Sequence, residues 1–202
     1  MGLSASKRFF ASVRYAVFVA IFLADLAPLR AQQMAVTLDP ASTEIHFTLG
    51  ATMHTVHGVF KLTSGQIQWD PLTGRASGAI VIDATSGSTD NTSRDKNMHA
   101  QVLESARFPE IVFRPSAVKG RVAAAGASQV DVAGVIVLHG MNHDETLECV
   151  VQPAGAGQLE ISTQLAVPFK TWGLKDPSTF LLHVADTVKV EVHALARIMT
   201  AP

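Results

Sequence analysis

The sequence predicts an all-β fold in which about eight antiparallel strands form a barrel or a sandwich. Short runs of alternating apolar and polar residues recur along the chain, and this alternation is typical of strands with one buried face. Clusters of glycine, proline, asparagine and aspartate separate the runs at hairpin spacing, whereas parallel strands need longer crossovers. The chain contains no internal repeat, and residues 32–202 suit one domain with a single core.

The first 31 residues have the order of features found in a secretory signal peptide. Three basic residues come first: Lys7, Arg8 and Arg14. The apolar run 15–24 follows, and the small residue Ala31 stands at a suitable cleavage site. The run is about half the roughly 20 residues that a membrane-spanning helix needs. We therefore expect cleavage after Ala31, export, and no membrane span in the mature chain, with an uncleaved N-terminal anchor as the alternative.

Charge and cysteine content restrict the partners of the mature chain. Cleavage removes four basic residues and one acidic residue, which leaves 12 basic and 16 acidic residues and a formal charge of −4. A mildly acidic surface argues against nucleic acid and anionic lipid headgroups as partners. Cys149 is the only cysteine, so no intrachain disulfide can form. We predict that Cys149 acts as a small buried hydrophobe on its strand.

The clearest predicted strand covers residues 187–194, where the residues at even positions are apolar and those at odd positions are polar. The same alternation occurs in residues 44–49 and 65–69. Further strands are predicted at residues 56–62, 76–84, 111–115, 130–138, 146–151 and 158–167.

Residues 93–105 lack this alternation and predict a short helix at about residues 94–104. Apolar residues recur there at helical spacing, and Ser93 is a suitable N-cap. We expect Arg94 and Asp95 to form a hydrogen-bonding pair at the helix start rather than a catalytic acid and base. A second irregular segment, residues 168–182, carries large apolar side chains that we expect to cover an opening of the barrel.

Several short motifs occur in order along nearly all of the mature chain. They are Asp39 with Pro40, residues 58–60, Asp70 with Pro71, Arg94 with Asp95 and Lys96, residues 108–113 and residues 132–140. Together they resemble the YceI-like family over about residues 36–194. The sequence departs from that pattern at Asn97, Met98 and Val137, and residues 167–179 resemble a subgroup trait.

The resemblance implies an antiparallel, eight-stranded, lipocalin-like β-barrel in the periplasm that encloses a polyisoprenoid or an isoprenoid quinone. Inward-facing positions of the predicted strands are apolar: Ile45, Phe47, Val56, Phe60, Ile67, Ile80, Ile82, Val112, Ile136, Leu138 and Val167. With Phe169, Trp172 and Phe180 of the irregular segment, they are the candidate ligand-binding residues. Burying a prenyl chain contributes roughly 0.8 kcal/mol per carbon group. We therefore expect the ligand to bind without a charged anchor, a cofactor or a metal, and we expect a protein that is not an enzyme.

Two other functions compete with lipid binding. Histidine pairs at separations of three and four residues could bind zinc or copper: His54 with His57, and His139 with His143; His99 is a further candidate. The chain has no Gly-x-Ser-x-Gly motif for a hydrolase. A barrel with a solid core that uses its rim loops for a protein partner is the other alternative, and the interior volume distinguishes it from a carrier. The strand edges allow a homodimer.

Overall fold

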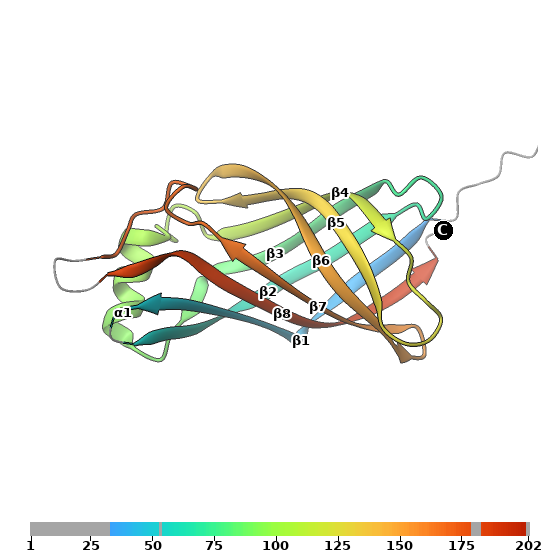
Figure 1. The fold of residues 1–202 in the computed structure, drawn as a ribbon, viewed down its shortest axis with the longest axis horizontal. Helices are drawn as coiled ribbons and strands as arrows, with labels where there is room; N and C mark the ends of the chain where they lie inside the picture. Colours follow the sequence, from blue (N-terminus) through green and yellow to red (C-terminus); the bar gives the residue numbers. More distant parts are fainter. Residues whose placement is uncertain (1–32, 53, 179–182, 201–202) are drawn as a thin grey trace, which may run out of the picture. The chain divides into compact units, whose positions relative to one another are not determined.

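The chain folds into a closed barrel of eight antiparallel strands (Figure 1), as the sequence and the family resemblance predict. The computed structural model describes residues 33–52, 54–178 and 183–200. The strands are β1 (Met34–Ala51), β2 (Thr55–Trp69), β3 (Ala76–Ser88), β4 (Glu110–Gly120), β5 (Ser128–Leu138), β6 (Met141–Gly155), β7 (Gln158–Val167) and β8 (Val184–Thr200). The two predicted strands at residues 56–62 and 65–69 are parts of the single strand β2. The predicted signal peptide, residues 1–31, lies outside the described residues, and its boundary stays a prediction.

Each strand pairs with its two neighbours in the sequence, and β8 closes the barrel against β1. Closure removes the continuous sheet edges that strand pairing between copies would use. A homodimer stays a prediction. Within the described ranges, no helix is long and apolar enough to cross a membrane.

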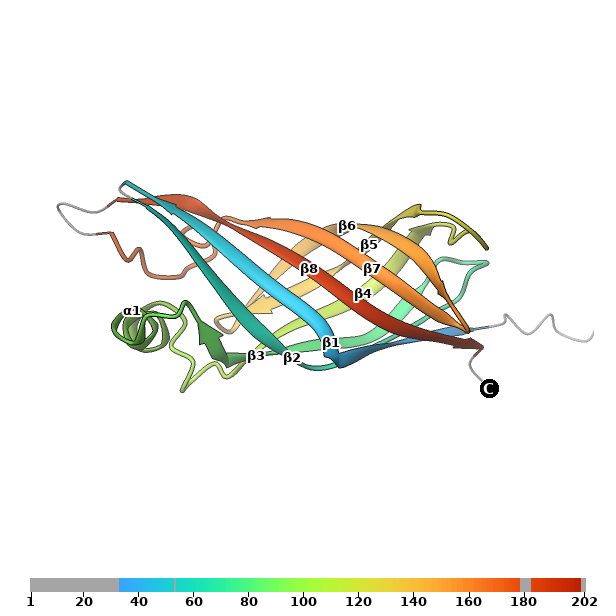
Figure 2. The same ribbon diagram turned by 90° about the horizontal axis from the view of Figure 1, so that it is seen from below.

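A bulge at Asp39 and Pro40 bends β1 (Figure 2). Proline cannot donate to a strand ladder, so it occurs at such irregularities. The Asp39 carboxylate accepts hydrogen bonds from the Ala41 amide and the Ser42 hydroxyl, each at 3.0 Å. The register with β8 shifts between Leu38 and Thr43. As a result, the inward-facing residues have even numbers before the bulge and odd numbers after it.

The predicted helix is present, but it begins and continues differently from the expectation. It consists of α1 (Thr92–Asn97) followed by one π-helical turn, η1 (Met98–Val102). Asn91, rather than Ser93, is the N-cap: its side chain accepts a hydrogen bond from the Arg94 amide at 3.0 Å. Figures 1 and 2 both show α1 at one end of the barrel, which we call the helix end. The opposite end, where β1 begins and β8 ends, is called the far end.

Arg94 and Asp95 hold the start of the helix through Thr89 rather than through each other. The Arg94 guanidinium donates to the Thr89 hydroxyl and carbonyl, each at 2.7 Å. The Asp95 carboxylate accepts from the Thr89 amide at 2.9 Å and also from the Thr89 hydroxyl. Thr89 is buried. Desolvation is the largest single effect on the pKa of Asp95 and raises it, but the hydrogen bonds oppose this effect and the net result is a lowered pKa. Both residues therefore make hydrogen bonds at the helix start, as predicted, but in the contacts of the described residues they do so through Thr89 and not as a direct pair.

Candidate ligand-binding cavity

The barrel encloses a cavity of about 1030 Å³ that extends along its interior. All eight strands contribute to its wall, and most of the lining side chains are aliphatic or aromatic. An eight-stranded barrel can either fill its interior with side chains or hold one small ligand. The alternative of a solid core is therefore wrong for this protein.

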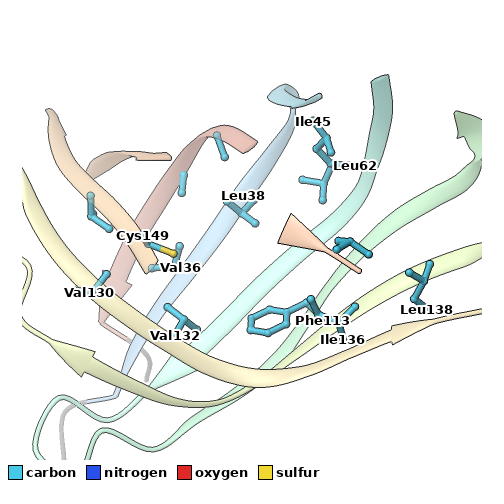
Figure 3. Close-up of a cluster of buried hydrophobic side chains, with 14 of the residues drawn as sticks. Val36, Leu38, Ile45, Leu62, Phe113, Val130, Val132, Ile136, Leu138 and Cys149 are labelled. Carbon is cyan, nitrogen blue, oxygen red and sulfur yellow. The ribbon is translucent and has the colours of Figure 1, made fainter. Parts of the chain in front are cut away.

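Most of the residues predicted to face inward line this cavity. From the strands these are Ile45, Phe47, Val56, Phe60, Ile67, Ile80, Ile82, Ile136, Leu138 and Val167, and from the irregular segment they are Phe169 and Trp172. Figure 3 shows the side chains of Ile45 on β1 and of Ile136 and Leu138 on β5 directed into the interior. Phe180 lies outside the described residues. Which of these side chains contact a ligand stays a prediction.

Val112 is the exception, because the structure places its neighbours in the cavity wall instead. Ile111 and Phe113 line the cavity, whereas Val112 does not. Val112 pairs with Val81 of β3 and Val137 of β5, which also lie outside the lining. A shift of one residue moves every side chain of a strand to the other face. In residues 111–113 all three side chains are apolar, so the pattern alone did not show which positions face inward.

The sequence interpretation missed lining residues at the far half of the barrel. Val130 and Val132 occur at even positions of β5, like the predicted Ile136 and Leu138, so an extension of the same alternation would have found them. Val36 and Leu38 also line the cavity. They precede the β1 bulge, and Pro40 is the sequence signal for the change of face there.

Cys149 lies in the wall among these apolar side chains (Figure 3). The side chain is buried, as predicted for a small hydrophobe. Desolvation by burial raises the pKa of the Cys149 thiol, although Thr163 partly opposes this shift. Because the thiolate is the reactive form, a raised pKa makes the thiol a poor nucleophile.

The described part of the irregular segment, residues 168–178, closes over the interior with its large side chains. Phe169, Trp172 and Leu174 are buried, with 3%, 7% and 6% of their surface exposed. The Trp172 indole stacks on the His143 ring, with centroids 4.0 Å apart and planes 4° from parallel. His143 lies in the part of β6 that precedes Cys149, and β6 pairs with β7 only from Cys149 onward. The segment therefore packs against strand residues that β7 leaves unpaired.

Lys170 fixes this segment to the start of β8. Its ammonium lies 2.7 Å from a carboxylate oxygen of Asp176 and 2.6 Å from one of Asp186. The hydrogen bond from Lys170 is the main reason that the pKa of Asp176 falls to about 2, and Ser178 contributes further. Asp176 is therefore ionised throughout the neutral range.

Of the candidate histidines, His99 and His139 have structural contacts, and His54 lines the cavity. His99 binds the Gly87 carbonyl at 2.8 Å and the Ser105 hydroxyl at 3.0 Å. His139 packs on Phe108, with ring centroids 4.5 Å apart. Across the described ranges, no three histidine, cysteine, aspartate or glutamate side chains converge in a way that could hold a metal ion. The zinc or copper alternative thus has no geometric support there.

Comparison with known proteins agrees with this geometry. A family model described as the YceI-like domain matches residues 36–196. BcnA of Burkholderia cenocepacia is 18% identical, with a TM-score of 0.65 over 78% of this chain and 98% of that chain. A polyisoprenoid binding domain from Saccharophagus degradans is also 18% identical, with a TM-score of 0.61 over 83% and 98% of the two chains. A YCEI protein of Campylobacter jejuni is 15% identical, with a TM-score of 0.57 over 72% and 86%. No curated protein matches the sequence.

Proposed function

Because the chain belongs to the YceI-like family and its barrel encloses an apolar cavity, we propose that it binds and carries an isoprenoid lipid or an isoprenoid quinone. The cavity of about 1030 Å³ is the observation that carries this proposal. It lies at the upper end of the range of volumes of small-molecule sites. The name of the Saccharophagus domain, which has the same fold, adds support for a polyisoprenoid as the ligand class.

The free energy of binding comes from apolar burial. Each carbon group removed from water contributes roughly 0.8 kcal/mol, so one isoprene unit of five carbons contributes about 4 kcal/mol before losses. Association itself costs on the order of 4–15 kcal/mol. A tail of a few isoprene units therefore binds without any ion pair.

We place the mature protein in the periplasm and assign it no catalytic activity and no resident cofactor. The predicted signal peptide supports export. The raised pKa of the Cys149 thiol argues against nucleophilic chemistry within the cavity. An isoprenoid quinone is on this proposal a ligand that is carried, not a redox cofactor.

Purification from a bacterial host that exports the chain tests the proposal. The periplasmic fraction is purified without detergent, extracted with organic solvent and examined by mass spectrometry for isoprenoids. We expect a bound isoprenoid in near-stoichiometric amount. We also expect the intact protein mass to equal that of a chain that begins after Ala31. A folded, exported protein that carries no lipid and does not take up an added isoprenoid quinone would contradict the proposal. A chain that retains residues 1–31 would contradict the cleavage alone.

A further inference from the structure

Polar groups line the cavity mainly at the helix end. The helical region contributes Asn91, Ser93, Arg94, Asn97 and Gln101, and the segment 168–178 contributes Lys175, Asp176 and Ser178. Asn97, Gln101 and Lys175 are exposed, so the cavity meets solvent there. The lining at the far end is apolar and includes Val36, Trp69, Val122 and Leu159. The two ends of the cavity therefore favour different ends of an amphiphile.

The helix end offers hydrogen-bond donors to a ligand. Lys175 Nζ donates to Gln101 Oε1 at 2.8 Å, and this contact joins the segment 168–178 to η1. An ammonium donates through several N–H groups, and a guanidinium has more still. Arg94 uses Nε and Nη2 for Thr89. In the contacts of the described residues, both cations thus retain N–H groups that can donate to oxygen atoms of a ligand.

The charges around these donors balance. Lys170 contacts Asp176 and Asp186, and Asp95 shares Thr89 with Arg94. Together with Lys175, which contacts Gln101, these side chains amount to three cations and three carboxylates. Of them, Arg94, Lys175 and Asp176 line the cavity, and Lys170, Asp95 and Asp186 lie beside it. Free donors in a region of balanced charge suit a neutral acceptor better than an anion, because electrostatic complementarity selects partners by charge.

We propose that the cavity binds its isoprenoid ligand in one direction, with a neutral, carbonyl-bearing head group at the helix end and the tail extending toward Trp69. The inference rests on the proposed function and deepens it. A quinone ring has the required chemistry, since its carbonyl oxygens accept hydrogen bonds from Lys175 and Arg94 without adding charge. The tail then lies against the apolar strands of the far half.

The two tryptophans of the chain can report the direction. Trp172 and Trp69 both line the cavity, near the helix end and at the far end respectively. Trp69→Phe leaves Trp172 as the only indole, and Trp172→Phe leaves Trp69. We expect a benzoquinone with an isoprenoid tail to quench the fluorescence of Trp172 strongly and that of Trp69 weakly. Equal, reversed or absent quenching in proteins that bind the quinone would overturn the direction.

A pair of lysine variants tests the head group separately. Lys175→Met should weaken quinone binding about tenfold, because one donor is lost, and should leave binding of an isoprenoid hydrocarbon without a head unchanged. Lys96→Met is the matched control, since Lys96 is an exposed lysine of α1 outside the cavity lining. Equal effects of the two variants would overturn the assignment of Lys175.

The choice of ligands also separates this inference from the proposed function. Tighter binding of a prenyl phosphate than of the quinone with the same tail would overturn the neutral head group. If neither the hydrocarbon nor the quinone binds, as measured by displacement of an apolar fluorescent dye, the proposed function fails together with this inference. Binding of the hydrocarbon without the expected preference for the quinone leaves the proposed function standing and overturns only the inference.

Discussion

Substitution of Cys149 by phenylalanine should block the cavity and weaken ligand binding. The phenyl ring has about five more heavy atoms than the thiol that it replaces, so it excludes about that number of ligand carbons, each worth roughly 0.8 kcal/mol. Full exclusion would cost about 4 kcal/mol, and accommodation of half of them by movement of the tail leaves about 2 kcal/mol. At 1.4 kcal/mol per factor of ten, the expected loss is roughly 30-fold.

The neighbouring residue provides the control for Cys149→Phe. Val150 lies on the same strand but outside the cavity lining, with 41% of its surface exposed. Val150→Phe adds a ring to the outer face and should leave affinity unchanged. Affinity is measured by displacement of an apolar fluorescent dye by an isoprenoid quinone, and circular dichroism melts check that both variants fold. The reasoning is refuted if the folded Cys149→Phe protein binds as tightly as the wild type, or if Val150→Phe weakens binding equally.

Two further predictions concern stability. Gly58→Ala should lower the free energy of unfolding by about 1–3 kcal/mol, because the new methyl group would collide with the ring of Phe47 and lie 2.6 Å from the Ser88 carbonyl oxygen. The control in urea unfolding is Gly50→Ala, whose methyl group would have an ordinary 3.7 Å contact. Equal stability of the two variants would contradict the prediction. The pKa of Asp176 is lowered from 3.8 to about 2, so its contribution to stability should be complete above pH 3.8 and lost as the pH falls toward 2. Asp176→Asn should therefore reduce the loss of folding stability between these pH values, as measured by tryptophan fluorescence during urea unfolding. An unchanged loss would show that the contact with Lys170 does not stabilise the fold.

Local sequence patterns determined the strands and many of their inward positions. Along β8, each apolar residue from Val188 to Ala194 occurs at an even position and lines the cavity. The alternation has the period of the strand itself, so it can be read without knowledge of the neighbours. The burial of Cys149 was predicted in the same way. Where the alternation fails, as at Val112 with an apolar residue on either side, the inward face depends on the register with β3 and β5.

Contacts between distant segments could not be read from such patterns. Trp172 stacks on His143, 29 positions earlier in the chain, and Lys175 reaches Gln101 of η1. Neither pair has a local sequence signal, because each depends on how the barrel brings its loops together at one end. Sequence reasoning suggested that the irregular segment covers an opening, and the structure supplied the residues against which it packs.

The sequence by itself therefore determined an all-β chain with one apolar face on most of its strands and one short helix. Only the tertiary structure decided that these faces surround an open cavity of about 1030 Å³. An inward-facing isoleucine has the same sequence signature in a filled core and in a cavity wall. The difference lies in the spacing of opposite walls, which strand number, tilt and register set together.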